Sequence, residues 1–177
     1  MSRQNRGRAR VVLLMGVCGS GKTTLGRSLA TRLGWVFLDA DDLHSPEARA
    51  EMTVGRPLDD RIRTQWIERV GLSIKASLER SESVVLACSA LRAKHRQALT
   101  TAARGDVVIA HLQGSAALIA DRLRKREGHF AGVSLLESQI ETLESPQGVL
   151  DLDISCSPEA LVDQLVCELA TGAVPSD

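Results

Sequence analysis

The residues with the clearest chemical potential form one segment near the N-terminus, Gly16-Val17-Cys18-Gly19-Ser20-Gly21-Lys22-Thr23. The segment matches G-x-x-x-x-G-K-[ST] in full, the pattern of a phosphate-binding loop, or P-loop. Its glycines let the backbone curl so that N–H groups point at phosphate oxygens, and a helix starting there adds positive dipole. Lys22 is then placed to neutralise the β- and γ-phosphates, and the Thr23 hydroxyl to ligate Mg²⁺. The residues expected to contact the nucleotide are Gly16, Val17, Cys18, Gly19, Ser20, Gly21, Lys22, Thr23 and Thr24.

Two classes of nucleotide-binding protein do not fit the rest of the chain. Guanine-specific switch proteins read the base with an N-K-x-D segment, but Asn5 is the only asparagine in the sequence. The signature of ATP-binding cassettes needs a Gly-Gly pair, and the sequence contains none. We therefore expect neither a GTPase switch nor an ATP-binding cassette, and the P-loop predicts a nucleoside triphosphate bound together with Mg²⁺.

A pair of carboxylates forms the second candidate site, in Phe37-Leu38-Asp39-Ala40-Asp41-Asp42-Leu43-His44. Alternation in an extended chain puts Asp39 and Asp41 on the same side, at the strand end where α/β sheets bind ligands. One carboxylate can hold the hydration shell of Mg²⁺, while the other orients an acceptor hydroxyl and takes its proton. A solvated turn or a helix cap is the alternative for the pair. His44 either contacts the substrate or serves a local hydrogen bond.

The elements that must position these residues follow from the apolar pattern. Short runs rich in Val, Ile and Leu alternate with longer amphipathic stretches, which is typical of βαβ units. Because these runs are apolar throughout, we expect an α/β fold with a five-stranded parallel sheet and helices on both faces. The expected strands span 11–15, 35–38, 84–88, 107–112 and 149–154, and the expected helices 23–33, 62–78, 94–103, 115–125, 134–143 and 158–170.

Composition bounds the remaining possibilities. The 177 residues suit one domain, which we place at 11–177 after a flexible basic tail at 1–10. Lys plus Arg and Asp plus Glu are both 22, so no global field favours nucleic acid or a membrane surface. No apolar run approaches the roughly 20 residues that span a bilayer. The four cysteines form no C-x-x-C pair, which favours a reduced, cytoplasmic setting.

Taken together, the motifs carry a family resemblance. The P-loop and the segment from Phe37 to His44 resemble those of the P-loop gluconokinases, the ATP-dependent kinases of D-gluconate. The resemblance continues in Met52-x-x-Gly55-x-Pro57-Leu58-x-Asp60, Trp66, Cys88-Ser89-Ala90-Leu91-Arg92, Gly128-His129-Phe130 and Gln139-x-Glu141-Thr142-Leu143-Glu144-x-Pro146. It implies a fold like that of nucleoside-monophosphate and shikimate kinases, commonly as a homodimer. The implied reaction is phosphorylation of the 6-hydroxyl of gluconate, giving 6-phosphogluconate.

The same resemblance assigns the acceptor side. It gives Asp41 to the acceptor hydroxyl and Asp39 to magnesium, and it makes Ser89, Ala90 and Leu91 a substrate-binding loop. Arg92 and Arg96 are then the nearest cations for the gluconate carboxylate, which a guanidinium fork holds well. The sequence departs from the usual family residues on this side, at Ala48, Glu51, Ile62, Gln65 and His95.

A cluster of cations predicts a lid over about 122–132. The stretch from Asp121 to Phe130 contains four cations within five residues, followed by a glycine. A transferring phosphoryl group spreads negative charge that cations brought in at closure can meet. We expect Arg122 and Arg126 to act in this way and His129 to contact the substrate. A solvated helix face is the alternative.

Two other functions stay open at this point. A shikimate kinase shares the Asp-x-Asp pair but needs a Gly-Gly-Gly turn where this chain has Ser89-Ala90-Leu91. A non-enzymatic, nucleotide-dependent binding module using the basic tail to contact RNA is the alternative of another class. It predicts ATP turnover that sugar acids do not affect.

Overall fold

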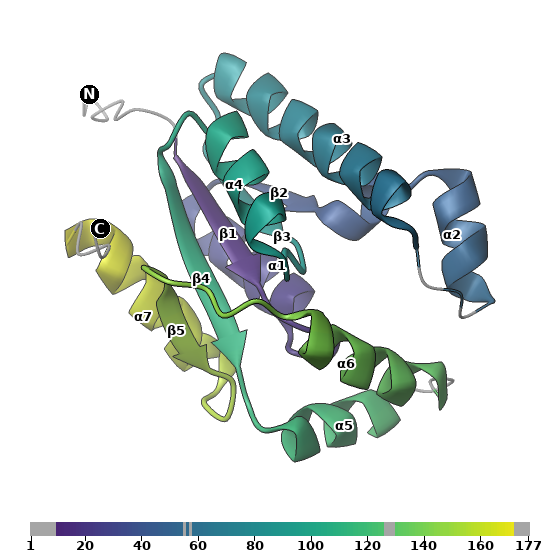
Figure 1. The fold of residues 1–177 in the computed structure, drawn as a ribbon. Helices are drawn as coiled ribbons and strands as arrows, with labels where there is room; N and C mark the ends of the chain where they lie inside the picture. Colours follow the sequence, from purple (N-terminus) through teal and green to yellow (C-terminus); the bar gives the residue numbers. More distant parts are fainter. Residues whose placement is uncertain (1–9, 55, 57, 126–129, 172–177) are drawn as a thin grey trace, which may run out of the picture.

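The computed structural model describes residues 10–54, 56, 58–125 and 130–171, without the side chains of 130–134. A five-stranded sheet in the order β2-β3-β1-β4-β5 forms its centre, with every neighbouring pair parallel (Figure 1). The strands are β1 (Val11–Met15), β2 (Val36–Asp39), β3 (Val84–Ala87), β4 (Val107–Gln113) and β5 (Leu150–Asp153). The predicted parallel sheet is confirmed, and the strand ends differ from expectation by no more than one residue.

The six predicted helices are present, and two short helical elements were not predicted. The helices are α1 (Lys22–Leu33), α3 (Asp60–Glu79), α4 (Ala93–Ala102), α5 (Ala116–Lys125), α6 (Phe130–Thr142) and α7 (Pro158–Thr171). Helix α6 begins four residues before the predicted start at 134, because Gly132 in its first turn weakens the helical signal. The additional elements are the 3₁₀-helix η1 (Ala40–Leu43) and α2 (Pro46–Thr53).

Side-chain hydrogen bonds explain the two unpredicted elements. The Asp39 carboxylate accepts from the Asp41 N–H and so begins η1. The Ser45 hydroxyl accepts from the Ala48 N–H at 3.1 Å, and Pro46 occupies the first turn of α2. Both elements are short and depend on caps rather than on an apolar period, which is why the hydrophobic pattern did not indicate them.

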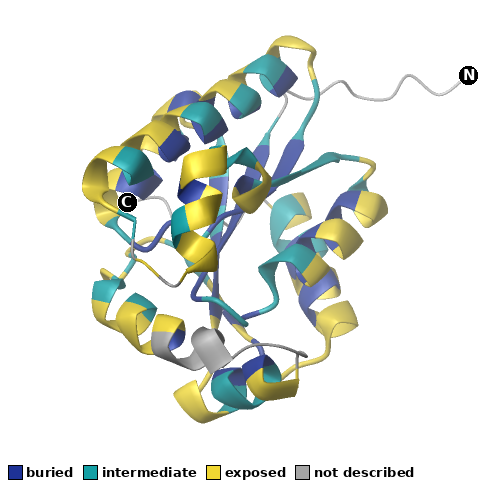
Figure 2. Cartoon of the chain, turned by 90° about the vertical axis from the view of Figure 1, so that its right-hand side faces the viewer, coloured by how far each residue is buried: buried dark blue, intermediate teal, exposed yellow. Residues whose placement is uncertain are grey.

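Alternate residues of β1 belong to two separate cores, one on each face of the sheet. Val12 and Leu14 pack with residues of α1, α5 and α7, whereas Val11, Leu13 and Met15 pack with residues of α3 and α4. Figure 2 shows this buried interior between the exposed outer faces of the helices. Because both faces are covered, β1 and β3 are apolar throughout. The same expectation was wrong for β5 at the edge of the sheet, which alternates leucine with exposed aspartate. Within the described ranges, no helix is long and apolar enough to cross a membrane.

The order of the strands brings the two predicted sites together. Strand β1 lies between β3 and β4, so the chain leaves β1 toward one side of the sheet and crosses to the other after β3. Ligands in open α/β sheets bind outside the carboxyl ends of the strands at such a switch point. The segments that follow β1, β2 and β3 therefore share one edge.

Gly16 is expected to tolerate a side chain less well than Gly34. Its φ is 144°, and an added Cβ would lie 2.9 Å from the Leu112 carbonyl oxygen. Gly34, at the end of α1, has a φ of 68° but no atom within 4 Å of an added Cβ. We expect Gly34→Ala to cost about 1 kcal/mol of unfolding free energy from backbone strain. Gly16→Ala should cost about 2–4 kcal/mol, because steric overlap adds to the strain.

Urea unfolding of the two glycine variants tests this difference. The midpoints are compared at unchanged slope, so that they report stability alone. Equal midpoints would show that the backbone around Gly16 moves freely enough to accept a methyl group.

Candidate active site

The P-loop joins β1 to α1 with the backbone conformation that its glycines predict. Gly16, Gly19 and Gly21 have φ values of 144°, 77° and 100°, where residues with side chains are strained. Gly21 is the N-cap of α1 and provides no side-chain oxygen to the first turn. The N–H groups at the start of α1 are therefore suited to an anion, which the helix dipole also favours.

The Lys22 side chain folds back onto the P-loop. Its ammonium donates to the carbonyl oxygens of Gly16 and Val17, each at 2.9 Å. Burial lowers the pKa of Lys22, and Asp41 is the strongest of the charges that oppose this shift. The Ser20 hydroxyl nearby is buried and has no hydrogen-bond partner within the described part of the chain. A desolvated cation beside an unsatisfied hydroxyl fits a phosphate ligand such as the polyphosphate of ATP.

Asp39 and Thr23 form the group with the chemistry of a magnesium site. The Thr23 hydroxyl donates to Asp39 Oδ2 at 2.8 Å, and the Asp41 N–H donates to Asp39 Oδ1 at 3.1 Å. These bonds join the start of α1 to the end of β2. A hydroxyl and one carboxylate, completed by water and phosphate oxygens, are the donor set that Mg²⁺ takes in phosphoryl-transfer sites. The residues therefore fit the metal that the motifs predict.

Asp41 follows at the start of η1 with a carboxylate that water can reach. Its side chain is 78% exposed, although protein surrounds it at longer range. Partial loss of solvation raises the pKa of Asp41, and the neighbouring Asp39 carboxylate raises it further, while Lys22 opposes both. A carboxylate with a raised pKa is a better acceptor for a hydroxyl proton at neutral pH. The environments of Asp39 and Asp41 thus suit the different roles expected for them.

His44 is a neutral, stacked side chain beside Asp41. Its ring lies 4.4 Å from that of Trp66 with an angle of 12° between the planes, and its side chain is 6% exposed. Burial, with Arg69 and Arg49 as further causes, lowers the pKa of His44 to about 4. Its Nε2 is 3.9 Å from Asp41 Oδ1. This placement leaves the two interpretations of His44, substrate contact or local partner, both compatible with the geometry.

Trp66 belongs to this site, although sequence reasoning placed it only in the apolar period of a helix. Its indole N–H donates to the Ala40 carbonyl oxygen at 2.6 Å, which ties α3 to η1. The signal available in the sequence was its position within the family resemblance, since periodicity alone cannot separate a core residue from a wall of the site.

The loop after β3 lies against the P-loop, as expected for an acceptor loop. The Gly16 N–H donates to the Ser89 carbonyl oxygen at 3.3 Å. Ala90 is fully buried and has a φ of 44°, a conformation that costs a residue with a side chain about 1 kcal/mol or more. Leu91 is also buried. Segments that are 70 residues apart in the chain are thus direct neighbours at the sheet edge.

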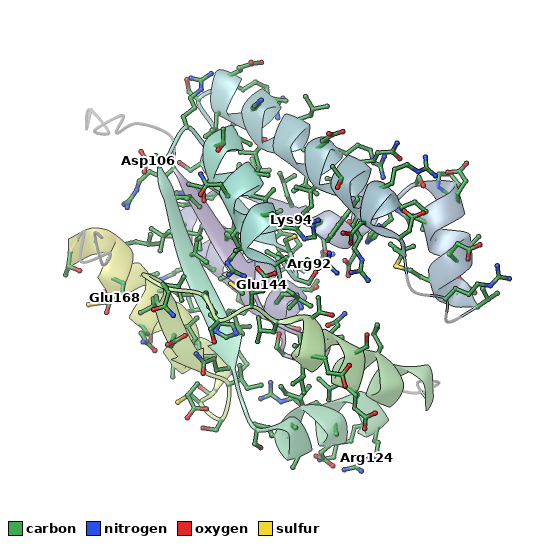
Figure 3. The ribbon with its side chains drawn as sticks, in the orientation of Figure 1. Arg92, Lys94, Asp106, Arg124, Glu144 and Glu168 are labelled. Carbon is green, nitrogen blue, oxygen red and sulfur yellow. The ribbon has the colours of Figure 1, made fainter. Side chains whose placement is uncertain are left out.

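The two arginines expected to bind the same carboxylate have different surroundings. Arg92 has a 28% exposed side chain and pairs with the exposed Asp60, which also pairs with Lys94. The guanidinium of Arg96 is buried and donates to three backbone carbonyl oxygens. Figure 3 shows Arg92 and Lys94 near the start of α4, close to Glu144. The structure therefore does not bring Arg92 and Arg96 together as one anion site.

The predicted lid is described in part. Arg122 on α5 donates to the Ile154 carbonyl oxygen at 2.6 Å and to that of Ser20, in the P-loop, at 3.5 Å. Arg124 and Lys125 are exposed at the end of α5. Arg126 and His129 lie outside the described residues. Among the cations predicted for the lid, Arg122 is thus the one with a contact to the P-loop in the described part of the chain.

Gln139 on α6 is a contact to the P-loop that the sequence analysis did not assign. Its side-chain oxygen accepts from the Cys18 N–H at 2.6 Å. Gln139 opens one of the elements that carry the family resemblance, which was the available signal. Val17, in contrast, is a buried core residue that offers the loop only its backbone, and Thr24 is exposed on α1.

Comparisons with known proteins show which family the chain belongs to. A family model described as an AAA domain matches residues 11–146. The chain is 38% identical over 163 residues to a gluconokinase of Gluconobacter oxydans strain 621H, an alignment that covers 89% of each protein. It is 36% identical over 193 residues to a gluconokinase of Arabidopsis thaliana, covering 99% of this chain and all of that protein.

Two solved structures resemble this chain to different degrees. A gluconokinase from Sinorhizobium meliloti 1021 superposes with a TM-score of 0.84 at 35% identity, covering 94% of both chains. Shikimate kinase from Aquifex aeolicus reaches a TM-score of 0.57 at 17% identity, which shows a shared fold only. With a P-loop, an adjoining acidic pair and full-length relatives of this kind, the chain belongs to the gluconokinase family of P-loop kinases.

Proposed function

We propose that this protein transfers the γ-phosphoryl group of ATP to the 6-hydroxyl of D-gluconate, giving 6-phospho-D-gluconate and ADP. The observation that carries the proposal is the direct link between the two halves of the site, from Thr23 in the P-loop through Asp39 to Asp41. The link holds the backbone of Asp41 beside the phosphate-binding residues, which supports an acceptor-side role for its carboxylate. The full-length similarity to gluconokinases supports gluconate as the acceptor.

On the donor side, backbone N–H groups of the P-loop and the start of α1 hold the phosphates. Lys22 exchanges its contacts with loop carbonyls for phosphate oxygens. Thr23 and Asp39 would hold Mg²⁺, which when bound neutralises charge on the transferring group. Arg122 and Arg126 add positive charge from the lid side. These residues contribute mainly electrostatic stabilisation, as phosphoryl transfer requires.

On the acceptor side, Asp41 orients the 6-hydroxyl and takes its proton as the new O–P bond forms. The bond from the γ-phosphorus to the bridging oxygen breaks, and ADP carries away its electron pair. Arg92 holds the carboxylate at the other end of gluconate, exchanging its exposed pair with Asp60 for the substrate. His44, Ser89, Ala90, Leu91 and His129 complete the expected contacts with the acceptor.

The proposal also includes a cytoplasmic homodimer without nucleic-acid or membrane partners. A net charge of zero supports the absence of polyanionic partners. Dimerisation rests on the family resemblance, and light scattering behind a sizing column measures it directly.

A panel of acceptors tests the proposed reaction. We expect D-gluconate to be phosphorylated with Mg²⁺ and ATP, and shikimate and AMP to be left essentially unchanged, in an assay that couples ADP release to a colour change. The physical reason is the acidic pair combined with a Ser89-Ala90-Leu91 loop in place of the triple glycine of shikimate kinases.

Two outcomes would contradict the proposed reaction. Equal or greater turnover of shikimate or AMP would assign another acceptor. ATP turnover that no sugar acid changes, together with polyanion binding lost on removal of residues 1–10, would favour the non-enzymatic binding module.

A further inference from the structure

Arg96, on α4, contacts the acceptor loop and the segment after α6 through three backbone carbonyl groups. From α4, its Nη1 donates to the carbonyl oxygens of Ala90 at 3.0 Å and Leu91 at 2.9 Å. Its Nη2 donates to the carbonyl oxygen of Glu144, just after α6, at 3.0 Å. The side chain is buried, with 8% of the residue exposed. The guanidinium fork therefore already has acceptors, and a substrate carboxylate would have to displace them.

Glu144 reinforces the same junction from the other side. Its N–H donates to the Leu91 carbonyl oxygen at 3.0 Å. Its carboxylate accepts from the Ala93 N–H at the start of α4. We call Arg96 and Glu144, with these bonds, the loop clasp. The clasp fixes the backbone at and directly after the strained Ala90, whose φ of 44° needs surrounding contacts to persist.

Helix α6 extends this junction to the P-loop. Gln139 bonds to the Cys18 N–H about one turn before α6 ends, and Glu144 follows two residues after Thr142, the last residue of the helix. The acceptor loop also contacts the P-loop directly through Ser89 and Gly16. The end of α6 thus touches both the loop for the phosphoryl donor and the loop for the acceptor.

We propose that Arg96 is a positioning residue that sets the acceptor loop against the P-loop through the loop clasp, and that Arg92 alone of these two arginines binds the substrate carboxylate. The inference rests on the proposed phosphorylation of gluconate. It changes the role expected for Arg96 from a substrate ligand to a residue that acts through the backbone of Ala90 and Leu91.

The two arginines make a matched pair for the test, because they differ in predicted role but lie one helical turn apart. Arg96→Lys keeps the charge and loses the fork that bridges carbonyls. Arg92→Ala removes the proposed carboxylate ligand, and Gln97→Ala alters an exposed neighbour as the control. Each variant is assayed with D-gluconate and with D-glucitol, a neutral polyol in which a CH₂OH group replaces the carboxylate.

Arg96→Lys is expected to lower kcat/KM for both acceptors by the same factor, up to about a hundredfold, because a displaced loop misplaces the hydroxyl. KM for ATP should stay unchanged. Arg92→Ala should lower kcat/KM for gluconate far more than for glucitol, so that the preference for the acid disappears. If glucitol is not phosphorylated, its inhibition constant against gluconate provides the same comparison.

Loss of the preference for the acid in Arg96→Lys would overturn the inference, and so would wild-type kinetics in that variant. Hydrogen exchange of the backbone of residues 89–93 supplies a readout that needs no acceptor. Faster exchange in Arg96→Lys than in Gln97→Ala is expected, and equal exchange would reject the clasp. Absence of gluconate turnover in the unmodified protein would instead reject the proposed function, with the exchange experiment still deciding the clasp.

Discussion

Lys22→Ala is expected to lower kcat by about a thousandfold or more while the fold survives. The Lys22 ammonium has two carbonyl partners in the P-loop and is desolvated, which lowers its pKa. It therefore contributes little to stability, and its charge is needed where negative charge develops on the phosphoryl group. Loss of one such donor from a preorganised site costs about a hundredfold to a thousandfold, and a full charge costs more.

The measurement combines the coupled assay with circular dichroism of the thermal transition. Lys75→Ala is the matched control, because Lys75 is an exposed lysine on α3, outside both the P-loop and the predicted lid. It should retain wild-type turnover. An active Lys22→Ala protein with normal ATP dependence would show that the P-loop does not take part in the reaction.

Asp41→Asn and Asp39→Asn are expected to fail in different ways. Asp41→Asn keeps the shape but cannot take the hydroxyl proton, so kcat should fall by about a hundredfold to ten-thousandfold at any magnesium concentration. Asp39→Asn weakens the group that Thr23 and Asp39 form for the metal. Its rate should therefore recover in part as Mg²⁺ is raised. Titration of Mg²⁺ against rate, at saturating ATP and gluconate, separates the two roles.

The pH profile provides the control for Asp41. Partial desolvation and Asp39 raise the Asp41 pKa above its ordinary value of 3.8, so the wild-type kcat/KM should fall as pH decreases through that raised pKa. His44 is neutral at near-neutral pH, because burial lowers its pKa to about 4. Asp41→Asn should lack the acidic limb. Magnesium rescue of Asp41→Asn but not of Asp39→Asn would exchange the two assignments, and near wild-type activity in both would make the pair structural.

The sequence by itself determined the elements whose signals are local. The central strands β1 and β3 are continuous apolar runs, because both sheet faces are covered there, and the P-loop is a contiguous motif whose glycines have the φ values that it requires. Gly34 ended the first helix for the same kind of reason, with a φ of 68° at its C-cap. Asp39 and Asp41 could also be found in this way, because Asp39 ends β2 and Asp41 follows two residues later.

Only the tertiary structure decided how the arginines are used. In the sequence, Arg92 and Arg96 are equivalent cations at the start of one helix, and spacing cannot show which of them meets backbone carbonyls. The difference arises because Glu144, about 50 residues later, returns to α4 and offers its carbonyl to Arg96, while Arg92 stays near solvent beside Asp60. The bond between Gln139 and Cys18 has the same origin. Such contacts depend on which segments the strand order brings to one sheet edge, and this long-range order is not encoded in any local pattern.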